Sequence, residues 1–176
     1  MPTSADRATP ADPAPPRLDL EVHDRAGFQA AVESTLAAAI ARSARTLWWV
    51  DRDFADWPLD RPALIAALSA WLHLPLRRLV LLAEGFELME RAHPRFSAWR
   101  RDWTHAIDPR VPSDADRGPL PTLLIDDGPV VLELWQPDPP RGRTAADALA
   151  ARTARERIDA TLQRSTPDWP LRPLGF

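Results

Sequence analysis

Two short, continuous apolar runs constrain the fold of this chain more than any other feature. Residues 46–50 read Thr-Leu-Trp-Trp-Val, and residues 79–83 read Leu-Val-Leu-Leu-Ala. A strand that is covered on one face alternates apolar and polar residues, whereas a strand covered on both faces is apolar throughout. Runs of four to eight residues are typical of strands, since helices are longer. Both runs therefore predict central strands of a sheet with helices on both faces.

Segments with helical periodicity alternate with these runs. Asp24 is a predicted N-cap, and after it apolar residues recur at spacings of three and four as far as Ile40. Asp60 followed by Pro62 predicts the start of a second helix between the two runs. A third helical region, interrupted at Pro94, follows the second run. This alternation of helices and strands predicts an α/β fold.

The second half of the chain predicts a hairpin and a last helix. A short edge strand is expected around residues 107–111, in a stretch rich in proline. Residues 122–125 and 130–134 flank Asp-Asp-Gly-Pro at 126–129, which predicts a β-hairpin built on a tight Asp-Gly turn. The last helix is expected from about residue 144 to residue 164. Together these elements predict an α/β sandwich with a mixed sheet.

Composition excludes several classes of function. The chain has no cysteine and only four histidines, so disulfides and thiol chemistry are excluded and neither a metal site nor a cofactor is expected. A net charge of −3 provides no basic stripe, so nucleic acid is not expected as a partner. No stretch approaches the roughly 18–20 apolar residues of a membrane span, so no membrane association is expected.

The N-terminal residues indicate where the predicted domain begins. Residues 1–17 contain neither an apolar segment nor a run of like charge, which predicts a disordered leader and not a signal peptide. Residues 18–176 are enough for a single domain with one core. We therefore expect one α/β domain in the cytoplasm.

The hairpin segment, residues 120–128, carries a resemblance to a known family. Members of the phospholipase D/nuclease superfamily carry His-x-Lys, four residues and then Asp-Gly on a strand that turns into a hairpin. Together with the predicted element order, the segment Leu-Pro-Thr-Leu-Leu-Ile-Asp-Asp-Gly resembles half of such a domain. The resemblance places Leu120 at the position of the histidine, Thr122 at that of the lysine and Asp127 at that of the aspartate. Residues 162–165 and Trp169 likewise resemble the end of uncharacterised bacterial phospholipase D-like domains.

The resemblance implies a member without catalysis. In the family, the histidine attacks a phosphodiester and the lysine holds the phosphate charge. Leu120 cannot act as a nucleophile, and Thr122 supplies no fixed charge. The chain has 22 arginines and no lysine, but replacement of lysine by arginine does not account for a threonine at residue 122. The implied role is binding or scaffolding, with an unknown protein partner. Catalytic relatives place two halves face to face, so a lone half also implies a homodimer through the apolar face near the hairpin.

A second enzymatic interpretation starts from Asp51-Arg52-Asp53, which directly follows the first apolar run. In haloacid dehalogenase-like phosphatases, a strand ending in Asp-x-Asp supplies a nucleophile and a general acid, and an Asp pair after a later strand holds Mg²⁺. Asp126 and Asp127 resemble that later pair. The alternative is therefore a Mg²⁺-dependent phosphatase in which the two acidic pairs converge, although residues 83–84 are Ala-Glu where that family binds phosphate through serine or threonine.

The eight tryptophans divide into two groups by their neighbours. Those within apolar patterns are predicted to lie in the core, namely Trp49, Trp71, Trp99 and Trp103. Those with polar or proline neighbours are compatible with exposed positions, namely Trp48, Trp57, Trp135 and Trp169. A cluster of exposed tryptophans would form a stacking platform or a protein interface.

Overall fold

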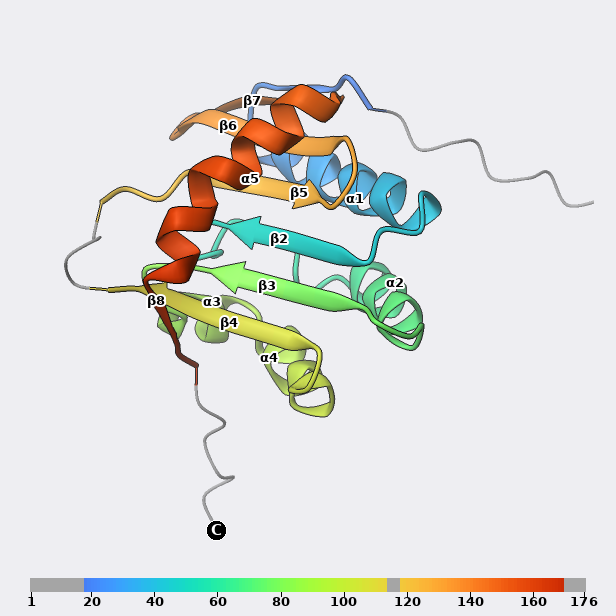
Figure 1. Ribbon diagram of the computed structural model, residues 1–176, viewed down its shortest axis with the longest axis vertical. Helices are drawn as coiled ribbons and strands as arrows, with labels where there is room; N and C mark the ends of the chain where they lie inside the picture. The colour runs from blue at the N-terminus through green and yellow to red at the C-terminus, as the bar shows by residue number, and fades with distance from the viewer. Residues whose placement is uncertain (1–17, 114–117, 170–176) are drawn as a thin grey trace, which may run out of the picture.

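A computed structural model describes residues 18–113 and 118–169, and Figure 1 shows them as one sheet with helices on both faces. The leader predicted at residues 1–17 lies outside the described residues. No helix in the described ranges is long and apolar enough to cross a membrane. In chain order the elements are β1 (Glu21–Val22), α1 (Arg25–Ala41), β2 (Thr46–Val50), α2 (Pro62–Leu72), β3 (Arg78–Leu82), α3 (Glu87–Ala92), α4 (Pro94–Trp99), η1 (Arg100–Trp103), β4 (Ile107–Pro112), β5 (Thr122–Asp126), β6 (Val130–Pro137), β7 (Pro140–Ala146), α5 (Ala148–Gln163) and β8 (Ser165–Pro167).

The sheet is mixed, as predicted, with the strand order β1-β7-β6-β5-β2-β3-β4-β8 among the described residues. Strands β2, β3 and β4 run parallel to one another. The neighbouring β5 is antiparallel to β2, and β6, β7 and β1 continue the antiparallel part. Both apolar runs are inner strands, which confirms the prediction from their composition.

The two faces of the sheet carry separate cores. Helices α1 to α4 cover one face and α5 crosses the other (Figure 1). Alternate residues of β2 serve the two faces: Leu47 and Trp49 belong to the core beneath α1 and α2, whereas Val50 belongs to the core beneath α5. A strand that is buried on both faces needs apolar side chains at successive positions. This is the physical reason for the continuous run.

The predicted hairpin is confirmed, but its turn is closed in a different way. The carboxylate of Asp126 accepts hydrogen bonds from the backbone N–H groups of Gly128 (2.9 Å) and Val130 (2.8 Å). Gly128 does not adopt the left-handed conformation that a tight Asp-Gly turn requires. Arg155 of α5 donates to the carbonyl oxygens of Asp126 (2.6 Å) and Gly128 (2.9 Å). The hairpin turn is therefore held by the Asp126 side chain at its start and by the Arg155 side chain from α5.

Two predicted elements differ from the observed ones. Thr144 is a buried residue of β7, and the last helix begins only at Ala148, where the Asp147 carboxylate accepts from two backbone N–H groups of the first turn. Strand β7 was not predicted because its residues form no apolar run. It lies between β6 and the short β1. The strand expected at the edge, β4, is an inner strand, since β8 pairs with its outer side.

The tryptophan predictions are partly wrong. Trp49 and Trp71 lie in the core as expected, and Trp135 is 66% exposed. Trp57 and Trp169, however, are only 1% and 5% exposed. Both are buried by contacts with residues distant in the sequence or across a loop, which local polarity does not reveal.

Candidate functional site

A cleft lies at the carboxyl ends of β2 and β3, beside the start of β5. It consists of two adjoining cavities of about 550 Å³ and 470 Å³, which we call the apolar cavity and the acidic cavity. The two cavities share part of their lining, namely Pro119, Leu120, Thr122, Leu134 and Pro137. Leu120 and Thr122 therefore lie in the wall between them. We call the combined feature the β2-end cleft.

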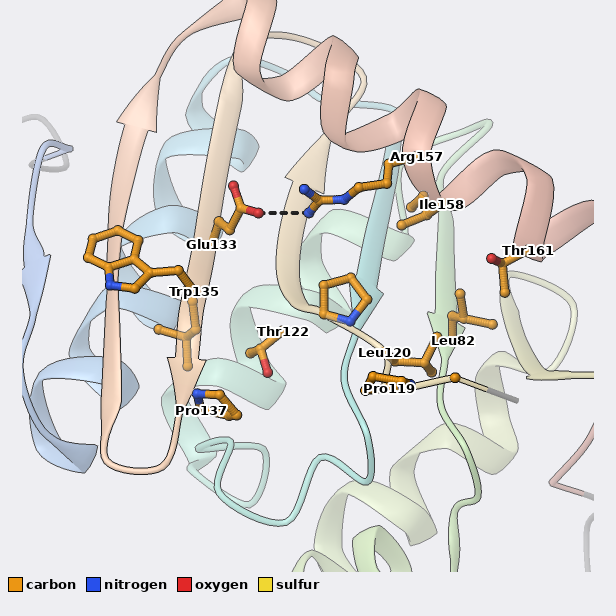
Figure 2. A pocket seen from close by; sticks show the side chains of 13 residues that line it. Leu82, Pro119, Leu120, Thr122, Glu133, Trp135, Pro137, Arg157, Ile158 and Thr161 are labelled. Atoms are coloured by element: carbon orange, nitrogen blue, oxygen red, sulfur yellow. Dashed lines mark hydrogen bonds and ion pairs between the residues drawn. The ribbon is translucent and has the colours of Figure 1, made fainter. Parts of the chain in front are cut away.

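The apolar cavity lies between β6 and α5 (Figure 2). Leu82, Leu120 and Ile158 provide apolar lining, and Trp135 stands at its rim with most of its surface in solvent. One ion pair crosses from α5 to β6: the guanidinium of Arg157 lies 2.7 Å from the Glu133 carboxylate. Charge is thus balanced on this side of the cleft.

The acidic cavity has an excess of negative charge. Its lining contains two arginines, Arg25 and Arg52, and five carboxylates, Asp51, Asp53, Asp56, Glu84 and Asp138. Arg25 lies 3.1 Å from Asp56, and Arg52 lies 3.0 Å from Asp53. The guanidiniums therefore neutralise at most two of the carboxylates, and the remaining ones repel anions.

Asp51 holds the loop that follows β2. One oxygen of its carboxylate accepts from the N–H groups of Phe54 (2.8 Å) and Asp53 (3.2 Å), and the other accepts from the Thr122 hydroxyl (2.6 Å). Phe54 is a buried residue with φ of 57°, a conformation that costs energy in a non-glycine residue and needs such support. Burial raises the pKa of Asp51, although these hydrogen bonds act in the opposite direction.

The raised pKa of Asp51 predicts a specific pH dependence. Because the folded state disfavours the charged carboxylate, the contribution of Asp51 to the free energy of unfolding is fully present below its ordinary pKa and declines as the pH rises through the raised pKa. In Asp51→Asn the amide oxygen can still accept from the N–H groups of Asp53 and Phe54, the amide NH2 can donate to the Thr122 oxygen, and the side chain cannot ionise. Urea unfolding at several pH values is expected to show a smaller decline for Asp51→Asn than for the unmodified chain.

A control for this measurement is Glu156→Gln, which also removes one carboxylate but lies on the exposed side of α5. It is expected to leave the pH profile nearly unchanged. An Asp51→Asn profile that falls more steeply with pH than that of the unmodified chain would contradict the role assigned to burial.

The two acidic pairs of the phosphatase interpretation do not converge. Asp51 and Asp53 follow the carboxyl end of β2, whereas Asp126 pairs with Leu47 near the other end of that strand. The Asp127 carboxylate accepts a hydrogen bond from the backbone N–H of Arg45 (3.2 Å), which precedes β2. In the described ranges no group of three acidic, histidine or cysteine side chains is placed to hold a metal ion. Because β5 is antiparallel to β2, its final aspartates lie at the opposite edge of the sheet.

Several residues of the cleft were missed by the sequence analysis. Glu84 follows the second apolar run just as Asp51 follows the first, and carboxyl ends of parallel strands meet at one edge, so this residue was open to prediction. Trp57, Asp56 and Asp138 come from loops whose placement depends on tertiary contacts. No local pattern marks them.

Comparisons with known proteins show the fold alone. No protein-family model and no curated protein matches the sequence. The chain is similar to TrmBL2, an archaeal chromatin protein whose structure shows a novel mode of DNA binding, with a TM-score of 0.58 and 11% sequence identity. The match covers 86% of this chain and 54% of the TrmBL2 chain, so this chain spans about half the length of that protein.

This likeness corrects the predicted partners. A chain of the same fold occurs in a DNA-binding chromatin protein, so the exclusion of nucleic acid from a net charge of −3 is wrong. The predicted homodimer through the apolar face near the hairpin finds no support either. The apolar side chains of β5 and β6 are already covered within one chain, on one face by α1 and on the other by α5.

Proposed function

We propose that this chain is a phospholipase D-like domain that has lost catalysis and acts in the cytoplasm by binding a partner in the β2-end cleft. The observation that carries the proposal is the composition of the cleft wall. Leu120 and Thr122 stand where the family resemblance places the nucleophile and the cation, and the Thr122 hydroxyl is engaged by Asp51 (2.6 Å).

The electrostatics of the cleft support the same proposal. Phosphodiester cleavage requires a nucleophile and positive groups that stabilise the developing charge on phosphate. No histidine lines either cavity among the described residues, and the acidic cavity contains more carboxylates than guanidiniums. An incoming phosphodiester would be repelled, whereas Leu82, Leu120 and Ile158 in the lining offer apolar contacts to a bound partner.

A hydrolysis assay tests the loss of catalysis. The chain is incubated with bis(p-nitrophenyl) phosphate, and with p-nitrophenyl phosphate in the presence of Mg²⁺, beside the variant Leu120→Ala/Thr122→Val. Both proteins are expected to give the same background rate with both substrates, because neither contains a nucleophile at the family position. A rate above background that disappears in the variant would contradict the proposal.

DNA binding is a second candidate function, favoured by the likeness to TrmBL2. The cleft is not suited to it because its carboxylates repel phosphate, so DNA would contact another face of the molecule. Fluorescence anisotropy of a labelled DNA duplex tests this candidate. Saturable binding that weakens steeply between about 50 and 200 mM salt supports it, and an unchanged signal at tens of micromolar chain excludes it.

A further inference from the structure

The β2-end cleft offers an apolar and an acidic surface side by side. The two cavities adjoin along Leu120, Thr122 and Leu134, so an extended occupant is able to contact both. On the apolar side, Trp135 is 66% exposed at the rim (Figure 2). Exposed tryptophans beside an apolar hollow are typical of protein-binding surfaces, where they become buried in the complex.

The charge of the acidic cavity selects a positively charged occupant. Glu84 and Asp138 are exposed, line the cavity and form no ion pair among the described residues. Arg52 and Arg25 are already paired with Asp53 and Asp56. A guanidinium or ammonium group in the acidic cavity would therefore be attracted by Glu84 and Asp138, neither of which forms a direct ion pair among the described residues.

A buried indole in the same cavity indicates a need for a hydrogen-bond acceptor. Trp57 lines the acidic cavity, is 1% exposed, and its Nε1–H has no acceptor among the described residues. A buried donor without a partner is costly, so a carbonyl oxygen that comes within reach of the Trp57 Nε1–H would satisfy a group that the fold leaves unpaired. A peptide backbone provides carbonyl oxygens, which a metal ion or a simple amine does not.

From these three observations we infer that the β2-end cleft binds an extended peptide segment of a partner protein, in which an arginine or lysine lies beside apolar residues. The basic side chain enters the acidic cavity, which Glu84 and Asp138 line, and the apolar neighbours occupy the cavity at Trp135. A backbone carbonyl of the segment supplies the acceptor for Trp57. This inference rests on the proposed non-catalytic binding function and names the class of partner for it.

Fluorescence anisotropy with defined peptides tests the inference. The probe is the fluorescein-labelled peptide Gly-Leu-Arg-Leu-Arg-Gly, and its counterpart carries glutamine in place of both arginines. The full chain is expected to bind the arginine peptide up to about thirtyfold more tightly than the glutamine peptide, because two ion pairs of up to about 1 kcal/mol each are lost. The difference is expected to shrink as salt is raised.

Three variants locate the binding to the cleft. Glu84→Gln/Asp138→Asn is expected to weaken binding of the arginine peptide about tenfold. Trp135→Ala is expected to weaken binding of both peptides about tenfold or more, because tryptophans dominate such interfaces. Asp102→Asn/Glu156→Gln removes the same charge from exposed residues outside the cleft and is expected to bind like the unmodified chain. Circular dichroism melting shows that each variant is folded.

The outcomes separate the inference from the proposed function. Equal affinity for the two peptides would overturn the inference, and so would an equal loss of peptide affinity in the cleft variants and in the control variant. Competition between the labelled DNA duplex and the peptide for the chain would overturn it as well. In those cases a background hydrolysis rate leaves the non-catalytic function standing. Hydrolysis that depends on Leu120 and Thr122 would instead overturn the proposed function.

Discussion

Replacing Trp169 by alanine is expected to lower the free energy of unfolding by about 3–5 kcal/mol. The indole of Trp169 stacks on Phe86 with ring centroids 4.9 Å apart and lies 4.1 Å from the guanidinium carbon of Arg100. Its Nε1 donates to a carboxylate oxygen of Glu90 (2.6 Å). Alanine would leave a cavity and remove the aromatic face from a buried cation. Urea unfolding monitored by circular dichroism measures the loss.

Trp135→Ala is the matched control for this measurement. It removes the same side chain from a position that is 66% exposed, so the expected change in the free energy of unfolding is within about 0.5 kcal/mol. Similar losses for the two variants would contradict the view that Trp169 belongs to the core and Trp135 to a binding surface.

Replacing Gly142 by alanine is expected to lower the free energy of unfolding by about 3 kcal/mol. Gly142 lies in β7, opposite Leu134 of β6, and β1 pairs with its other side at Val22. A Cβ atom at this residue would overlap the carbonyl oxygen of Glu133 and lie 2.8 Å from the Cα of Leu134. Backbone atoms cannot yield as a flexible side chain would, so β6 and β7 must separate.

The effect of Gly142→Ala is expected to extend to the cleft, because the displaced part of β6 carries Glu133, Leu134 and Trp135. Anisotropy with the arginine peptide is expected to show weaker binding by the folded fraction of this variant. Gly118→Ala is the control, since a Cβ atom at Gly118 meets nothing within 4 Å although this residue also lines the cleft. A loss of stability at residue 118 as large as at residue 142 would contradict the steric explanation.

The fold was predictable where a single strand had to serve two cores. The continuous apolar composition of residues 46–50 predicts a strand that is buried on both faces, and the structure confirms this. Strand β7 carries no such signal, because its formation depends on the close approach that Gly142 permits to β6. The burial of Trp169 likewise depends on Phe86 and Arg100, more than sixty residues earlier in the chain.

The candidate site was predictable only at its strand ends. Asp51 was identified because it follows an apolar run, and Leu120 and Thr122 because of the family resemblance. Asp51 and Asp126 do not converge, because β5 runs antiparallel to β2 and its end therefore lies opposite the end of β2. The order of strands in the sequence does not reveal their direction in the sheet. The loop residues that make the cleft acidic have no pattern of their own.

The central claim is that the β2-end cleft binds a partner, and the indole N–H signals of the eight tryptophans in a two-dimensional NMR spectrum test it most directly. Single Trp→Phe variants assign the signals, and the arginine peptide is then added. The account predicts shifts for Trp57 and Trp135 and none for Trp71, whose Nε1 already donates to the carbonyl oxygen of Ala44 (2.7 Å). Unchanged signals for Trp57 and Trp135 at saturating peptide, or shifts confined to other tryptophans, would contradict it.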